Sequence, residues 1–242
     1  MLGASNLSAG LRDVAALARA GIDGPLELYA AAGNGRSYGQ LSRFLGRVLP
    51  GIDACGLWSA LDSTRSARTL ALLTDVGNDL AFGASAAQVQ GWLELALDRL
   101  ARHDALTVVT GLPLASVERM PPWEFRLWSK ILFPWHAIER SRLLAQAREL
   151  EARLEQLSRA RGLHKVDPQL EWYGHDPIHV RRGARATAWE HYLAPWGLRA
   201  RPAAELEWRG RAWYERVRLF GRECGVPQPC ARFSGAASLW LY

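Results

Sequence analysis

Three residues have the types and spacing needed for acyl-transfer chemistry. Ser5 stands at the start of an amphipathic stretch, and Asp176 precedes His179 by three residues. A serine hydroxyl is a poor nucleophile until a base removes its proton, and histidine is a suitable base because its ordinary pKa is about 6.5. An Asp-x-x-His turn can place the carboxylate against the ring nitrogen that faces away from the serine. These residues could therefore serve as nucleophile, acid and base.

Two further segments could supply hydrogen-bond donors to an oxyanion. Gly35 lies in the segment GNGRS, and Asn78 lies in the segment DVGND. The backbone N–H groups of Ser5 and Gly35 and the side-chain amide of Asn78 would be the donors, with Gly33 as an alternative to Gly35. Each residue also has a structural interpretation, as a helix cap, a turn glycine, a loop asparagine or a buried histidine.

The elements that must position these residues alternate between apolar runs and amphipathic stretches, which is typical of an α/β sheet. Ligands bind at the carboxyl ends of the strands in such a sheet. The four segments that contain Ser5, Gly35, Asn78 and the Asp176–His179 turn should therefore converge on one cleft. Buried strands are predicted over Leu26–Ala31, Thr69–Thr74 and Leu106–Thr110 and near Leu170–Tyr173. Helices are predicted over Leu11–Ala20, Tyr38–Val48, Ala87–Arg102, about Ala137–Arg161 (ended by Gly162) and about Gly183–Leu193.

Together, the four segments resemble the blocks of the SGNH (GDSL-type) hydrolase superfamily over Leu2 to His179. The resemblance implies an α/β fold, a three-layer α/β/α sandwich with a flavodoxin-like, mostly parallel sheet of about five strands. It implies a serine hydrolase that cleaves carboxylic esters, of the esterase, lipase or deacetylase type, without a cofactor. Residue by residue, the family's catalytic residues match Ser5, Asp176 and His179, and its oxyanion donors match Ser5, Gly35 and Asn78.

The sequence departs from the family pattern at three places. Ala4 stands where the family usually has Asp, and Val76 stands where it usually has Gly. Only Met1 and Leu2 precede the first block, so the first strand is either short or begins upstream. These departures motivate an alternative, a catalytically inactive binding protein of the same fold. An acyltransferase, in which an alcohol replaces water, is a further alternative.

Length and composition indicate one domain over residues 1–242. Hydrophobic residues make up 49% and charged residues 22% of the chain, which excludes disordered and collagen-like classes. No apolar run approaches the ~18 residues of a membrane span, and the N-terminal residues MLGASNLSAG do not resemble a signal peptide. We therefore expect a cytoplasmic protein. Residues 116–136 could form a lid or wall, and residues 195–242 a basic, Trp-rich C-terminal extension.

The net charge of +6 is confined to the last quarter of the chain, where residues 181–242 hold 11 basic and 5 acidic side chains. This region could contact an anionic substrate or surface, and a nucleic-acid partner is not expected. Arg36 either reaches an anionic substrate group or lies exposed. The expected substrate is a small-molecule, glycan or lipid ester.

Cysteine and histidine spacing leaves two questions for the structure. Cys224 and Cys230 are close enough in sequence to form a disulfide, and a reduced pair is equally consistent. His175 and His179 have the i, i+4 spacing of helical metal ligands. Pro177 between them argues against a helix, so we expect no metal site.

Overall fold

The computed structural model describes residues 1–64, 68–133, 136, 138–198, 209–210, 213–233 and 236–242. The chain is a mixed α/β protein. One parallel sheet contains β4 (Leu70–Leu73), β5 (Leu106–Thr110) and β6 (His164–Val166). Another sheet has the order β1 (Leu26–Ala30), β11 (Ala237–Leu241), β10 (Ala231–Phe233) and β7 (Arg209–Gly210), and β1 and β11 are parallel.

Leu2 connects these two sheets. It pairs with Ala31 on one side and with Leu73 on the other, both in the parallel sense. The Leu2 N–H donates to the Leu72 carbonyl at 2.8 Å, and the Leu2 carbonyl accepts from the Thr74 N–H at 2.9 Å. A single residue thus takes the place of a strand between β1 and β4, three positions before Ser5.

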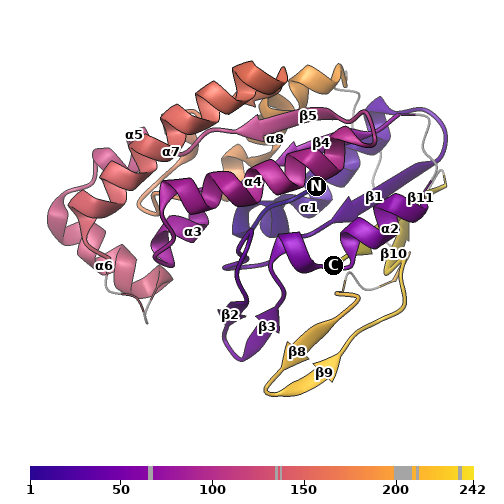
Figure 1. Cartoon of the computed structure of the whole chain (residues 1–242), viewed down its shortest axis with the longest axis horizontal. Helices are drawn as coiled ribbons and strands as arrows, with labels where there is room; N and C mark the ends of the chain where they lie inside the picture. The colour runs from indigo at the N-terminus through magenta and orange to yellow at the C-terminus, as the bar shows by residue number, and fades with distance from the viewer. Residues whose placement is uncertain (65–67, 134–135, 137, 199–208, 211–212, 234–235) are drawn as a thin grey trace.

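Two hydrophobic clusters lie on the two faces of these strands, because side chains alternate along a strand. Leu28 and Ala30 pack with α1 (Ser5–Gly21) and α8 (Arg185–Leu193). Tyr29 and Ala31 belong to the cluster of α2 (Leu57–Ser63), α4 (Ala86–Ala101) and α7 (Arg140–Arg161). Figure 1 shows these helices around the strands.

Local signals account for the helix boundaries. The buried residues of α1 recur at helical spacing, with Leu7, Leu11, Val14 and Ala18 on one face. A capping box between Ser85 and Gln88 begins α4. Gly162, with φ of +65°, ends α7 in the left-handed conformation that glycine adopts without strain.

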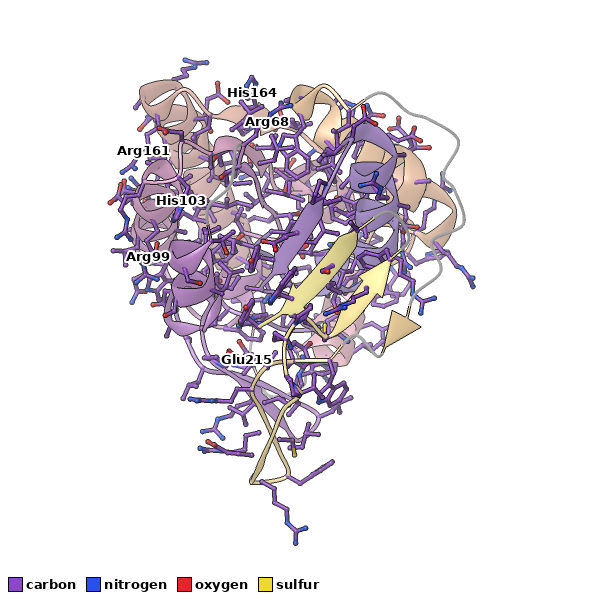
Figure 2. The ribbon with its side chains drawn as sticks, turned by 90° about the vertical axis from the view of Figure 1, so that its right-hand side faces the viewer. Arg68, Arg99, His103, Arg161, His164 and Glu215 are labelled. Atoms are coloured by element: carbon purple, nitrogen blue, oxygen red, sulfur yellow. The ribbon has the colours of Figure 1, made fainter. Side chains whose placement is uncertain are left out.

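A small antiparallel sheet corrects the helix predicted over Tyr38–Val48. It contains β2 (Ser42–Phe44), β3 (Arg47–Leu49), β8 (Val217–Leu219) and β9 (Arg222–Cys224). Leu45 and Gly46 have φ of 45° and 78°, and two successive positive φ values form a hairpin turn that a helix cannot contain. Figure 2 shows this sheet projecting from the body, with Glu215 near its base.

The strand predicted near Leu170–Tyr173 is also wrong. Leu170–Trp172 form a 3₁₀ helix, η2, that buries Trp172. The strand is β6, which begins six residues earlier and pairs with β5. Because β6 lies at the edge of the described sheet, it does not need an apolar run. Two of its three residues, HKV, are polar, so no strand signal was visible there in the sequence.

The remaining segments include residues 116–136, predicted as a lid or wall, and residues 195–242, predicted as a C-terminal extension. Within and beside residues 116–136 lie α5 (Leu114–Glu118) and α6 (Pro122–Leu132), while residues 134–135 and 137, including the predicted start of the long helix, lie outside the described residues. Residues 195–242 supply β10 and β11, and Trp208 lies outside the described part. Short helices are α3 (Asn78–Ala81), η1 (Ile52–Ala54), η3 (Arg182–Ala184) and η4 (Ala194–Trp196). None of the described helices has the length and apolar character of a membrane span.

Candidate active site

Ser5, His179 and Asp176 form a continuous chain of hydrogen bonds. The Ser5 Oγ lies 2.7 Å from His179 Nε2, and His179 Nδ1 lies 2.7 Å from Asp176 Oδ2. With its proton on Nδ1, the neutral imidazole donates to the carboxylate and accepts from the serine hydroxyl. Ser5 and His179 are 174 positions apart in the sequence, so the fold brings together the three predicted catalytic residues.

The Asp176 carboxylate is held by its own turn. Its Oδ1 accepts hydrogen bonds from the N–H groups of Ile178 and His179, both at 3.0 Å, which leaves Oδ2 for the imidazole. Burial favours the neutral carboxyl group, but these bonds and the facing His179 outweigh it and lower the pKa of Asp176. The residue is therefore a carboxylate at neutral pH.

The basicity of His179 is set by opposing effects. Burial by itself lowers its pKa, but the hydrogen bond and charge of Asp176, with the charge of Asp75, outweigh burial and the opposing Arg185. The net result is a pKa above the ordinary value of 6.5. The imidazolium that forms when His179 takes the serine proton is thus stabilised where it is needed.

Asn6 positions the loop that carries the histidine, a role that the sequence did not reveal. Its side-chain amide nitrogen donates to the Ile178 carbonyl at 2.8 Å, and its oxygen accepts from the Val180 N–H at 2.9 Å. These two bonds flank His179 on both sides. The only sequence signal is a polar residue directly after Ser5, and these two partners lie more than 170 positions away.

Asp75 positions the nucleophile, and the sequence did not reveal this role either. Its Oδ2 accepts from the N–H groups of Ala4 and Leu7, at 2.7 and 3.2 Å. Its Oδ1 accepts from the Asn6 amide at 2.8 Å. Ala4 gives the start of α1 no side-chain cap, so a carboxylate at the end of β4 satisfies these donors and complements the helix dipole. An aspartate directly after an apolar strand was the available signal.

The predicted oxyanion donors lie on three adjoining segments. Asn78 lines the same cavity as Ser5, and its Nδ2 donates to the Arg36 carbonyl at 3.0 Å, which ties it to the loop of Gly35. Gly35 itself, with φ of +66°, does not line that cavity. Among the described residues, neither the Ser5 N–H nor the Gly35 N–H has a hydrogen-bond acceptor.

Buried polar contacts hold the Gly35 loop in place. Asp79 accepts hydrogen bonds from the Ser37 hydroxyl and, at 3.0 Å, from the Tyr38 N–H. Burial raises the pKa of Asp79 to about 6, although the bond from Ser37 acts in the opposite direction. The Tyr38 hydroxyl lies 3.1 and 2.9 Å from the carbonyls of Leu2 and Thr74. The loop is therefore anchored to both segments that flank the nucleophile.

Arg36 takes neither of the two roles considered for it. Its side chain is fully buried and donates to the carbonyls of Ala32 and Tyr242. Burial lowers the pKa of its guanidinium. Arg36 therefore connects the Gly35 loop to Tyr242, the residue after β11, and is excluded from solvent.

An apolar cavity of about 120 Å³ opens beside Ser5. Residues of α3, α5 and α7 form part of its wall, and two members of the 116–136 region, Val117 and Phe133, contribute to it. Its other apolar lining includes Leu80, Leu112, Leu144 and Ala147. A cavity of about 150 Å³ holds benzene, so this one has room for a short acyl chain.

Neither histidine nor cysteine spacing produces a second site. His175 is exposed and contacts Glu124 Oε1 at 3.3 Å through Nδ1, outside any helix shared with His179. No group of three His, Cys, Asp or Glu side chains with metal-ligand geometry occurs among the described residues. Cys55, Cys224 and Cys230 are free thiols, and Cys224 is exposed while Cys230 is buried.

Comparisons with known proteins add no functional information. The sequence matches no model of a protein family, and a comparison with curated proteins finds no match. The function is therefore inferred from the residues of the site and their geometry.

Proposed function

We propose that this chain is a serine hydrolase of the SGNH type that cleaves carboxylic esters through an acyl-enzyme on Ser5. The observation that carries the proposal is the unbroken chain from Asp176 through His179 to Ser5, with 2.7 Å at each side-chain contact. Asn6 and Asp75 support it, because the hydrogen bonds of both side chains hold the segments that carry Ser5 and His179. A serine that served only as a helix cap would need no such environment.

We interpret the fold as the three-layer α/β/α sandwich of that superfamily. This interpretation is supported by Leu2, which pairs with residues next to β1 and β4 in the parallel sense, so that β11, β1, β4, β5 and β6 would form one mostly parallel succession. The two hydrophobic clusters place α1 and α8 against one face and α2, α4 and α7 against the other. Ser5, Asp75 and Asn78 then lie at the carboxyl edge of the sheet, where ligands bind in open α/β folds.

In the acylation step, His179 removes the Ser5 proton as Oγ attacks the ester carbonyl. Asp176 stabilises the resulting imidazolium and holds the ring in the productive tautomer. The negative charge that develops on the carbonyl oxygen is stabilised by the N–H groups of Ser5 and Gly35 and by the Asn78 amide. Removal of one such donor typically lowers the rate by about 10²–10³-fold.

The tetrahedral intermediate collapses when the C–O bond to the alcohol breaks. His179 gives its proton to the departing alkoxide, which leaves as the alcohol, and the acyl group remains esterified to Ser5. In deacylation, His179 removes a proton from water, and the hydroxide oxygen attacks the acyl carbonyl. Collapse of this second intermediate returns the proton to Ser5 and releases the carboxylic acid.

The cavity beside Ser5 indicates the acyl group. Its wall is formed mainly by leucine, valine, alanine and aromatic side chains, with polar groups at the end where Ser5 and Asn78 lie. Such a wall favours an uncharged hydrocarbon chain. We propose that esters of short fatty acids, with about four to six carbons in the acyl chain, are the preferred substrates.

Labelling with a fluorophosphonate probe tests the proposal directly. The wild-type protein should become labelled on Ser5, located by peptide mass mapping, and Ser5→Ala and His179→Ala should abolish labelling. Ser8→Ala is a matched control on the same helix and should label normally. Absence of labelling on folded wild-type protein, or labelling that survives Ser5→Ala, would refute the assignment. The first result would favour a non-catalytic binding protein.

A further inference from the structure

Helix α6 presents an apolar stripe to solvent. Trp123, Leu127 and Ile131 follow one another at i, i+4 and i+8 on this eleven-residue helix, so they lie on one face. Their exposed fractions are 62%, 50% and 56%. Of the eleven residues, all within the described part of the chain, only Phe125 is buried. Packing against the core therefore does not account for the stripe.

The geometry of the helix places the stripe on its outer side. A helix turns by about 100° per residue, so the three apolar side chains span about 80° of the circumference. Leu127 is at the centre of the stripe, about 160° from the buried Phe125. Figure 1 shows α6 at the outer edge of the molecule, away from the strands. The stripe thus points away from the body of the protein.

Basic side chains border the stripe. Arg126 and Lys130 are exposed, and each precedes a member of the stripe by one position. Neither has an ion-pair partner among the described residues. The acidic residue of the helix, Glu124, is only 19% exposed, and its Oε1 lies 3.3 Å from His175 Nδ1. The outer face of α6 therefore combines hydrocarbon with positive charge.

This combination is typical of helices that lie in the surface of a lipid bilayer. The apolar side chains enter the boundary between headgroups and acyl chains, and tryptophan in particular is enriched at headgroup level. Long basic side chains cover the edge of the apolar area with their stems and keep the charge among the lipid phosphates. Arg126 and Lys130 are positioned to do so beside the stripe.

The outer face of α6 is small for a contact with another protein. Eleven residues form a helix about 16 Å long and about 10 Å wide, so this face covers about 160 Å². A specific protein–protein interface buries about 600 Å² or more on each partner. A bilayer needs no complementary shape, because each apolar side chain is removed from water separately. The area of the face therefore favours a lipid surface over a second copy of the chain.

The helix ends beside the apolar cavity of the candidate site. α6 ends at Leu132, and the next residue, Phe133, lines the cavity that opens beside Ser5. The Phe133 ring also contacts that of Phe82, with 5.5 Å between the centroids. A lipid surface in contact with α6 would therefore lie close to this cavity.

We propose that α6 binds the surface of an anionic phospholipid bilayer. Trp123, Leu127 and Ile131 would enter the apolar boundary, and Arg126 and Lys130 would contact the phosphates. For the proposed hydrolase, this contact would bring the cavity to esters held at a lipid surface. That consequence rests on the proposed function, whereas the lipid contact itself does not.

The test is co-sedimentation with vesicles of phosphatidylcholine that contain 30% phosphatidylglycerol. All variants carry Ser5→Ala, so that no lipid ester is hydrolysed. Leu127→Glu should weaken binding at least about tenfold, because a charge replaces an apolar side chain at the centre of the stripe. Leu95→Glu is the matched control, since Leu95 is 49% exposed on α4 and Leu127 is 50% exposed on α6. The control should bind as the parent protein does.

A second pair of measurements tests the charge. Arg126→Gln combined with Lys130→Gln should weaken binding to the anionic vesicles about tenfold, because basic residues are attracted to an anionic surface. Binding of the same variant to vesicles of pure phosphatidylcholine should stay within about twofold of the parent, since these vesicles have no net surface charge. An equal loss on both kinds of vesicle would contradict the assigned role of the two basic residues.

Three outcomes would overturn the proposal as a whole. One is the absence of sedimentation with anionic vesicles at about 5 mM lipid. Another is an equal loss of binding in Leu127→Glu and Leu95→Glu. The third is a dimer in analytical ultracentrifugation without lipid that Leu127→Glu abolishes, which would assign the stripe to a second copy of the chain. Since none of these readouts involves catalysis, failure here is distinguishable from failure of the proposed esterase function.

Discussion

The side chains that position the candidate nucleophile and base are held by several contacts at once. Asp176 uses one carboxylate oxygen for two backbone N–H groups and the other for His179. Asn6 uses both ends of its amide on the loop around His179. Multiple contacts restrict the rotamers of these groups, so the distance between Ser5 and His179 is set before a substrate binds.

The first prediction concerns pH. Because neutral His179 is the base and its pKa is raised, kcat/KM should increase with pH through an apparent pKa above 6.5. Asp176→Asn removes the main cause of the shift, so its apparent pKa should fall and its rate should drop by about 10⁴-fold. Rate measurements from pH 5 to 9 with a short-chain ester test this. A variant with an unchanged midpoint would contradict the assigned role of Asp176.

The raised pKa of His179 also makes the stability of the folded protein depend on pH. A group whose pKa is higher in the folded state contributes stability that is fully present below its unfolded pKa, about 6.5. That contribution is lost as pH rises through the higher folded value. The proposed hydrolase activity should therefore increase over the same pH range in which this contribution to stability declines.

The second prediction concerns Asn6. Asn6→Ala removes the two bonds that flank His179, so the imidazole should sample unproductive orientations. We expect kcat to fall by about 10–100-fold with little change in KM, as for groups that position a catalytic residue. Steady-state kinetics and the rate of fluorophosphonate labelling should fall in parallel. Unchanged labelling would show that Asn6 does not position His179.

At the scale of the elements, strand ends and helix starts supply the polar groups. Asp75 follows β4 and caps α1, while Asn78 begins α3 and contacts the loop after β1. Asp79 ties α3 to that loop through Ser37 and Tyr38. Apolar residues of α3, α5 and α7 then form one part of the wall of the space beside the nucleophile.

The third prediction tests the acyl cavity through α7. Ala147 is buried and lines the cavity, so Ala147→Leu should fill part of it. We expect kcat/KM for a hexanoate ester to fall at least about tenfold, while the value for an acetate ester stays within about twofold. Ala145→Leu, on the exposed face of the same helix, is the matched control. Equal losses for both esters would show that acyl chains do not enter this cavity.

At the scale of the whole molecule, the first and last residues meet in one part of the structure. β11 lies between β1 and β10, and the Tyr242 carbonyl accepts from the buried Arg36. Residues 195–242, which we described as an extension, thus contribute strands that pack in the cluster of α1 and α8. The small sheet of β2, β3, β8 and β9 likewise joins two distant segments.

The fourth prediction tests this arrangement by stability. Leu239 in β11 is fully buried, so Leu239→Ala should lower the free energy of unfolding by about 2–5 kcal/mol. Ser238→Ala, on the neighbouring position of the same strand, should change it by less than about 0.5 kcal/mol. Denaturant unfolding of the two variants measures the difference. Equal effects would mean that β11 is peripheral to the core.

The sequence by itself determined the elements whose signal is local. The apolar runs of β1, β4 and β5 and the periodic faces of α4 and α7 were predicted close to their observed bounds, since a strand or helix pattern is read within a few residues. The helix predicted over Leu11–Ala20 is α1, which begins six residues earlier, at Ser5. Ser5, Asp176 and His179 were predicted as a group from four short segments, and the structure places them in contact.

Only the tertiary structure decided which distant groups meet. Asn6, Asp75 and the hairpin of β2 and β3 gain their roles from partners far away in the chain, and so does β6, whose polar residues are stable as a strand only beside β5. Periodicity reports which face of an element is apolar, but it carries no information about which element covers that face. Hydrogen bonds between distant segments are fixed by packing, and packing is a property of the folded chain.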